Sequence, residues 1–193
     1  MSEIAPVRDV VSGLQMETVK KAAGINLDVA CGKRKQEGPG WVGIDKRPLD
    51  GVDIVHDLWT FPWPIESDSV NLLLCNHYLE HVPGWIFMET MAEIHRVCRH
   101  KSQVMIAGPY GLGYRWQQDP THVKPIVEST FAYFDPTIRD GSLWRIYEPP
   151  ILHMMHFSRV PAGGDADFNC CLVVCKDPED CEYCKKGNRD HEE

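Results

Sequence analysis

The 193-residue sequence has no long apolar run and no excess of positive charge. No window approaches the roughly twenty uninterrupted apolar residues that a membrane-spanning helix needs, so we expect no membrane span. Twenty Lys and Arg against 28 Asp and Glu give a net charge of −8, which argues against a nucleic-acid-binding surface. Residues Met1 to Val11 mix charges with a proline and do not form the apolar run of a signal peptide. We therefore expect a cytoplasmic protein without a nucleic-acid partner.

The sequence also lacks internal repeats and the composition of a small disulfide scaffold. Its eight cysteines belong to a chain that is 43% hydrophobic, which is enough to build one domain with a substantial core. Most of the cysteines fall within apolar segments, and we interpret them as small core residues in a reducing compartment.

Short apolar runs alternate with loops and one clear helical stretch, a pattern typical of a layered α/β domain. Val70–Cys75 and Val104–Ala107 are nearly continuous apolar runs, as expected for central parallel strands covered on both faces. Between them, Pro83 to Arg99 has apolar residues at helical spacing and predicts a crossover helix. Strands are predicted at 26–30, 42–44, 53–56, 70–75, 103–107, 151–158 and 169–175.

Three segments depart from this pattern. Residues 1–24 form an N-terminal extension, and the domain is expected to span 25–176. Residues 110–147 hold many aromatics, glycines and prolines with weak periodicity, which predicts an irregular insertion that shapes a substrate pocket or forms a lid over it. Residues 177–193 are charged and are expected to form a flexible tail.

Two strand ends suggest a ligand site. Leu27–Gly32 is an apolar strand that ends in small residues and a glycine, where a ligand can approach the backbone. Trp41–Asp45 is a second strand, and its final acid is well placed to accept hydrogen bonds from a ribose diol; the alternative is that Asp45 caps a turn. The fingerprint G-x-G-x-x-G is absent after Gly32, so a nucleoside without a pyrophosphate fits better than a nicotinamide or flavin.

In order and spacing, four blocks resemble the class I S-adenosylmethionine-dependent methyltransferases. They are Leu27–Gly32, Trp41–Asp45, Val55–Leu58 and Ser67–Pro83, within a resemblance that covers roughly residues 25–109. The resemblance implies a Rossmann-like, doubly wound α/β fold. Its mostly parallel seven-stranded sheet would have helices on both faces and an irregular insertion after the fifth strand. It also implies S-adenosylmethionine as the cofactor and methyl transfer as the reaction.

The resemblance further implies roles for residues at the first two strand ends. Backbone around Ala30, Cys31 and Gly32 would lie against the methionine part of the cofactor, with Asp28 helping to orient its amino group. Asp45 would hold the ribose hydroxyls.

Later residues would contact the adenine and the reacting methyl group. The resemblance places Asp57 and Leu58 at the adenine, with the carboxylate accepting from the exocyclic amine. Asn76 and His77, after the fourth strand, would face the methyl group and its acceptor.

The connection between the first two strands departs from the usual family pattern. Only nine residues, 33–41, separate Gly32 from Val42, and they include Gly38-Pro39-Gly40. A full crossover helix does not fit in this interval. A subgroup of the family has a loop there, so the chain resembles a compact variant.

Methyl transfer requires donor and acceptor to be held close together and in line. An oxygen or nitrogen acceptor that loses a proton also needs a general base, and neutral imidazole is available at cellular pH. The candidates are His77 and His122, followed by His81. The alternative is that these histidines only form hydrogen bonds within loops.

The last cysteines offer a second candidate site. Cys171, Cys175, Cys181 and Cys184 could bind zinc through four thiolates, and His191 follows them. The Cys-x-x-Cys pair occurs once, however, whereas a strong zinc pattern repeats it. The sequence therefore predicts no metal site and leaves zinc as the alternative.

Several functions remain open at this stage. The first is methylation of a small molecule or glycan-type acceptor in a pocket roofed by aromatic residues of the insertion. RNA or protein methylation fits the acidic charge less well, unless a partner subunit supplies the contact surface. The others are a non-catalytic module that binds the cofactor or a partner, and a nicotinamide-dependent dehydrogenase, which the missing glycine pattern disfavours.

Overall fold

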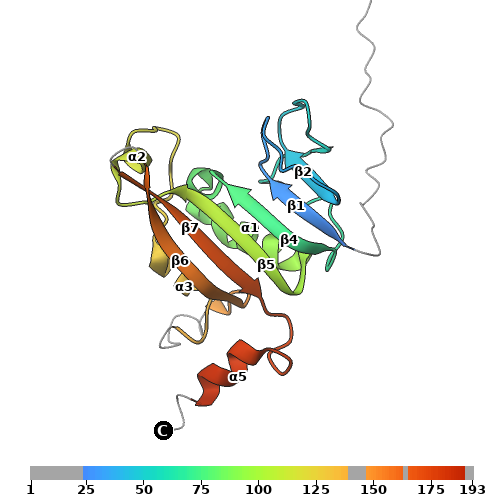
Figure 1. Cartoon of the computed structure of the whole chain (residues 1–193), viewed down its shortest axis with the longest axis vertical. Coiled ribbons are helices and arrows are strands. Elements are labelled where there is room, and N and C mark those ends of the chain that lie inside the picture. Colours follow the sequence, from blue (N-terminus) through green and yellow to red (C-terminus); the bar gives the residue numbers. More distant parts are fainter. Residues whose placement is uncertain (1–23, 139–146, 163–164, 190–193) are drawn as a thin grey trace, which may run out of the picture.

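A computed structural model describes residues 24–138, 147–162 and 165–189, and a seven-stranded sheet forms its centre (Figure 1). The strand order is β3-β2-β1-β4-β5-β7-β6. The parallel strands are β1 (Ile25–Val29), β2 (Trp41–Asp45), β3 (Ile54–Val55), β4 (Val70–Asn76) and β5 (Cys98–Pro109). The antiparallel strands β6 (Leu152–Ala162) and β7 (Asp165–Val174) complete the sheet beside β5. The predicted α/β fold class and its seven strands are confirmed.

The order of the central strands follows from their apolar runs. β1 lies between β2 and β4, with Leu27 opposite Val42 on one side and Leu73 on the other. Residues of β1 and β4 such as Leu27 and Leu73 have no exposed surface, as expected for strands in the middle of a sheet. The chain reverses its strand order at β1, and in such sheets ligands bind at the carboxyl ends of the strands flanking this point.

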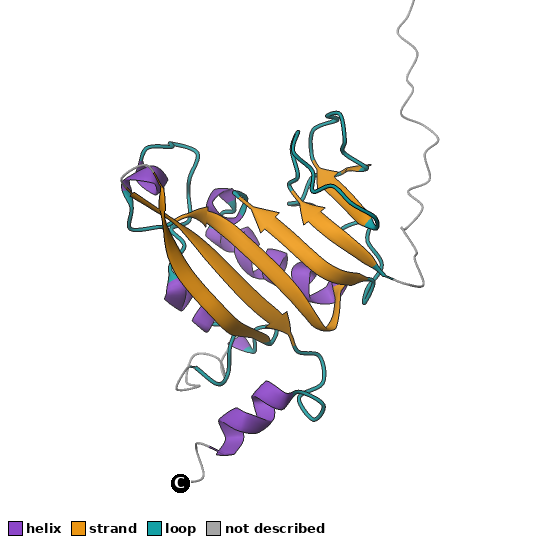
Figure 2. Ribbon diagram, in the orientation of Figure 1, coloured by secondary structure: helices purple, strands orange, loops and turns teal. Residues whose placement is uncertain are grey.

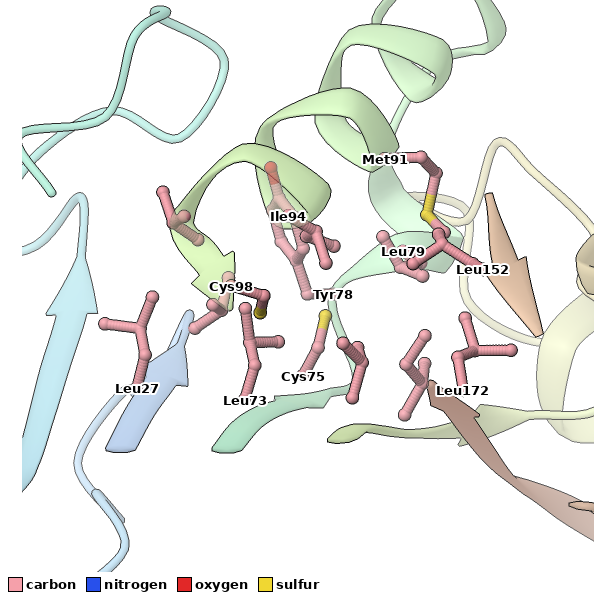
Figure 3. Packing of buried hydrophobic residues seen from close by; sticks show 14 of the residues in the cluster. Leu27, Leu73, Cys75, Tyr78, Leu79, Met91, Ile94, Cys98, Leu152 and Leu172 are labelled. Atoms are coloured by element: carbon pink, nitrogen blue, oxygen red, sulfur yellow. The ribbon is translucent and has the colours of Figure 1, made fainter. Parts of the chain in front are cut away.

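Helix α1 (Gly84–Val97) connects β4 to β5 and covers one face of the sheet. Pro83 is its N-cap residue, and His95 and Arg96 place positive charge in its last turn. In Figure 3, Ile94 and Met91 of α1 face the sheet, opposite side chains that include Leu73, Cys75 and Leu172. The predicted crossover helix is therefore confirmed, and it anchors the core.

The opposite face is more open at its centre, where Met105 of β5 is 36% exposed. Helices α1 and α3 (Glu128–Ala132) both lie behind the sheet in the view of Figure 2. Further helices among the described residues are η1 (Leu79–His81), α2 (Tyr114–Gln117) and α5 (Glu182–Arg189). Within the described residues, no helix has both the length and the apolar character needed to cross a membrane.

The segments outside the sheet and α1 differ in how much regular structure they contain. Residues 31–40, between β1 and β2, form turns without a helix, and residues 110–138 contain only the short helices α2 and α3. The predicted tail, in contrast, contains α5, which the sequence pattern does not reveal. The rest of the predicted insertion at 139–146 and most of the N-terminal extension, residues 1–23, lie outside the described residues.

Candidate functional site

A cavity of about 540 Å³ opens at the carboxyl ends of β1, β2 and β4. Its volume is in the range of small-molecule sites. It is lined by Ala30, Asp45, Lys46, Arg47, Asp57, Leu58, Trp59, His77, Tyr78, His81 and Thr121. Ala30, Asp45, Asp57, Leu58 and His77 are among the residues predicted for the cofactor or the acceptor. The structure thus brings residues from four separate sequence blocks to one cavity.

The backbone after β1 turns sharply at the edge of this cavity. Ala30 has φ 54° and Gly32 has φ 56°, both in the left-handed region. For Ala30, whose side chain disfavours that region, this conformation costs free energy and is typical of functional sites. Cys31 is buried with its sulfur against Gly43, where an added Cβ would lie 2.7 Å from it. Of the predicted segment 30–32, only Ala30 lines the cavity.

The carboxylate of Asp45 organises the ends of β1 and β2. Its Oδ2 accepts a hydrogen bond from the Gly32 amide at 2.9 Å, and its Oδ1 accepts from the Arg47 amide at 2.9 Å and from Arg47 Nε at 3.2 Å. Burial raises the pKa of Asp45, but the hydrogen bonds from Arg47 and Gly32 outweigh burial and leave the pKa below its usual value. Asp45 is therefore an ionised acceptor at the cavity wall, and its Arg47 partner is exposed.

Asp28 precedes the turn at Ala30 in β1 and does not itself line the cavity. It is buried, and its Oδ2 accepts a hydrogen bond of 2.7 Å from the amide of Gln36 in the loop between β1 and β2. Burial raises its pKa. Asp28 thus holds the loop that replaces a crossover helix, and its implied role at the cofactor's amino group stays a prediction.

Asp57 and Leu58 lie on the opposite wall, after β3. Asp57 is exposed and accepts a hydrogen bond from the Trp59 amide at 3.1 Å, while Leu58 is buried. Trp59 also lines the cavity and is 45% exposed. Trp59 was not predicted as a site residue, although an aromatic ring directly after the pair predicted to contact an adenine is a natural surface for a base to stack on.

A second cavity, of about 240 Å³, adjoins the first, and His77 and His81 line both. Its other lining residues are Glu80, Pro109, Arg115, Gln118, Asp119 and His122. All three predicted histidines therefore lie around this second cavity. Asn76 is exposed at the end of β4 and does not line either cavity.

His77 is held in a strained position by the end of β4. Its φ is 51°, and its Nδ1 lies 3.4 Å from Oε1 of Glu80, a carboxylate that is 1% exposed. Glu80 raises the pKa of His77; burial opposes this, while Asp167 adds to the rise and Arg115 reduces it. Glu80 was not predicted as a site residue. Its signal in the sequence is an acid next to a histidine in the block Leu79–Val82.

His81 and His122 pack against each other, with ring centroids 4.8 Å apart. Nδ1 of His122 lies 2.7 Å from the Trp116 carbonyl, and Nδ1 of His81 lies 3.2 Å from the Thr121 carbonyl. A carbonyl only accepts, so these contacts assign a proton to each Nδ1, and Nε2 of His122 lies 3.7 Å from Oδ2 of Asp119. Glu80, His81 and His122 each place one potential metal-ligand atom, a carboxylate oxygen or a ring nitrogen, within 4.8 Å of the other two. We interpret the three as an acid-base cluster.

The fold can be compared with solved structures. No protein-family model and no curated protein matches the sequence. A SAM-dependent methyltransferase from Archaeoglobus fulgidus aligns with a TM-score of 0.54 at 14% identity, over 79% of this chain and 87% of that chain. NodS, an N-methyltransferase of Bradyrhizobium japonicum bound to S-adenosylhomocysteine, aligns with a TM-score of 0.53 at 10% identity, over 83% of each chain. The fold is that of the class I S-adenosylmethionine-dependent methyltransferases.

A third example is the 1,6-didemethyltoxoflavin-N1-methyltransferase of Burkholderia thailandensis, with a TM-score of 0.54 and 14% identity over 79% of this chain and 71% of that chain. It was crystallised with its small-molecule substrate and S-adenosylhomocysteine. At these identities the similarity establishes the fold, and the activity has to be argued from the residues of this chain.

A third cavity, of about 630 Å³, lies at the opposite ends of the strands and is bordered by residues that include Asp68, Arg96 and Lys176. Asp68 precedes β4 and Lys176 follows β7, so this cavity faces the amino ends of the parallel strands. Because open α/β sheets bind ligands at the carboxyl ends, we assign the candidate site to the other two cavities.

Proposed function

We propose that this chain transfers a methyl group from S-adenosylmethionine to a small polar acceptor. The observation that supports it most directly is the arrangement of two adjoining cavities that share His77 and His81. One is large enough for a nucleoside cofactor, and the smaller one is lined by groups that bind and deprotonate polar molecules. A methyl donor in the first would meet its acceptor where these histidines lie.

The residues around the larger cavity fit S-adenosylmethionine. An ionised Asp45 accepts hydrogen bonds, as a ribose diol requires, and its exposed Arg47 partner can turn away to release it. Asp57 offers a carboxylate to the adenine amine, and Leu58 and Trp59 offer apolar surface to the ring. The turn at Ala30 brings backbone to the cavity wall, where the methionine part would lie. When bound, the cofactor supplies an electrophilic methyl group.

The smaller cavity supplies acceptor binding and proton removal. Arg115 and Asp119 give it both charges, so it suits a compact polar molecule such as a small metabolite or a sugar unit. His77, next to the buried Glu80 carboxylate, is the preferred general base because Glu80 stabilises the imidazolium that forms when the proton is taken. His122, which in its neutral form has a lone pair on Nε2, is the second candidate.

The alternative is a module of the same fold that binds S-adenosylmethionine, or a partner, without turnover. The polar lining of the smaller cavity favours the enzyme, because a binding module has no need of three histidines and a buried carboxylate beside the ligand. Methylation of RNA or protein is a further alternative. It is disfavoured by the net charge of −8 and by an acceptor cavity of only about 240 Å³.

Calorimetric titration of the purified chain with S-adenosylmethionine and with S-adenosylhomocysteine tests the cofactor. We expect micromolar binding of both and none of NADH, which serves as the control. A screen of small polar acceptors, with S-adenosylhomocysteine release as the readout, then tests turnover. Binding without release across amines, hydroxy acids and sugars would favour the non-catalytic module, and failure to bind either ligand would overturn the proposal.

A further inference from the structure

A second group of reactive side chains lies where β6 begins and β7 ends, at the opposite ends of the strands from the histidine cluster. His153 near the start of β6, Cys175 just beyond β7, and Cys181 and Cys184 at the start of α5 converge there. One potential ligand atom from each lies within 4.8 Å of all the others. In Figure 1, α5 lies below the ends of β6 and β7, away from the loop that contains α2.

Three of the distances between these atoms are close to those around a tetrahedral zinc ion, and the others are within 4.8 Å. Sγ of Cys175 and Cys184 are 3.7 Å apart, and Nε2 of His153 lies 3.2 Å from Sγ of Cys184 and 3.3 Å from Sγ of Cys181. Zinc bonds of about 2.3 Å to sulfur and about 2.0 Å to nitrogen put tetrahedral ligands about 3.8 Å apart for two sulfurs and about 3.5 Å apart for sulfur and nitrogen. Little movement is therefore needed to bind the ion.

The partner of His153 gives an independent reason to expect a metal. Nδ1 of His153 lies 3.1 Å from Oδ1 of Asp135, and the exposed fractions of the two residues are 1% and 2%. Asp135 is itself fixed by hydrogen bonds from Thr137 and from the Met154 amide. A carboxylate that holds Nδ1–H turns the lone pair of Nε2 toward the three sulfurs, which is the usual support for a zinc-bound histidine.

We propose that His153, Cys175, Cys181 and Cys184 form a structural zinc site. The three thiols lose their protons to solvent on binding, and the four ligands close the coordination shell, so no position remains for a substrate. The ion fastens α5 to the ends of β6 and β7. The site is independent of the proposed methyl transfer, since no residue belongs to both.

This site differs from the one that the cysteine pattern suggests. Cys171, the fourth thiolate considered from the sequence, pairs with Met105 and His156 within the sheet and does not join the group. Cys175 lies beyond the last residue of β7, so the strand alternation that would relate it to Cys171 no longer applies. His153 takes the fourth position, and nothing in its sequence neighbourhood marks it as a ligand.

Metal analysis of the full chain, purified under reducing conditions without chelators, tests the proposal. We expect about one zinc ion per chain, and we expect Co²⁺ exchange to give the sulfur-to-metal charge-transfer absorption of a tetrahedral thiolate site. Cys184→Ser should lose the metal, whereas the matched variant Cys171→Ser should retain it.

Asp135→Asn tests the positioning role of the carboxylate. It should weaken zinc affinity by about 10- to 100-fold in competition with a chelating dye, with the cobalt spectrum still that of three thiolates. Because Cys184→Ser could fail to fold, the wild-type chain is also stripped with EDTA and titrated with Co²⁺. A wild-type chain without bound zinc and without the charge-transfer band would overturn the proposal, as would a Cys175–Cys184 disulfide found in its place under reducing conditions.

Discussion

Asp45 accepts hydrogen bonds from the Gly32 amide and from the amide and guanidinium of Arg47, and it lines the cavity proposed for the cofactor. Replacing it with alanine removes a charged acceptor for the ribose and frees the Gly32 amide. A hydrogen bond to a charged group contributes about 1.5–3 kcal/mol, so Asp45→Ala should weaken S-adenosylhomocysteine binding by about 10- to 100-fold in calorimetry. Asp50→Ala, at an exposed position of the following loop, is the control. Unchanged affinity in a folded Asp45→Ala protein would contradict the ribose assignment.

The His77–Glu80 pair predicts a measurable change in protonation. Glu80 stabilises protonated His77, so removing the negative charge in Glu80→Gln should lower the pKa of His77. If His77 is the base, the rise of activity with pH should move to lower pH in the same variant, because the ring loses its proton earlier. NMR titration of the His77 ring measures the shift without a known acceptor. Glu89→Gln, on the exposed side of α1, should leave it unchanged, and an equal pKa in Glu80→Gln and wild type would rule out the pairing.

At the scale of elements, the sequence predicts the strands and helices that a local pattern of apolar residues specifies. All seven strands and α1 were predictable, the strands as short apolar runs and α1 from apolar residues at helical spacing. Helix α5 was missed because Glu182–Arg189 is short and consists mostly of charged and polar residues, with few apolar residues such as Tyr183 and Cys184 to show a helical spacing. What holds α5 in place is a set of contacts with β6 and β7 that periodicity cannot reveal.

A buried carboxylate, Asp28, holds the middle of the loop between β1 and β2. Asp28→Ala leaves the Gln36 amide without its partner, and the loss of a hydrogen bond to a charged group should lower the free energy of unfolding by about 1–3 kcal/mol in urea titration. Hydrogen exchange at the Gln36 amide should become faster. Glu37→Ala, exposed on the same loop, is the control and should change neither quantity. Equal exchange rates in Asp28→Ala and wild type would show that the loop is held in another way.

At the scale of the whole molecule, the candidate sites depend on chain topology. Part of the lining of the larger cavity was predictable, because parallel strands place their carboxyl ends together and so bring Asp45 at the end of β2 near Asp57 after β3. The roles of Glu80 and His153 were not, because each acts through a neighbour that the fold supplies. Glu80 faces a histidine held at an unusual φ, and His153 meets cysteines that follow another strand.

The two proposed sites lie at opposite ends of the strands of one sheet and share no residue. This separation leads to a prediction about stability. A ligand that binds only the folded state raises the free energy of unfolding by an amount set by its concentration and affinity. When two ligand sites share no residue, their contributions to the free energy of unfolding should add to within about 0.5 kcal/mol. The stabilisation by S-adenosylhomocysteine in urea titration should therefore be the same in zinc-loaded and EDTA-stripped protein, with Cys171→Ser behaving as wild type in both. If S-adenosylhomocysteine no longer stabilises the protein after zinc is removed, the two sites are coupled through the sheet. Zinc would then support activity as well as stability.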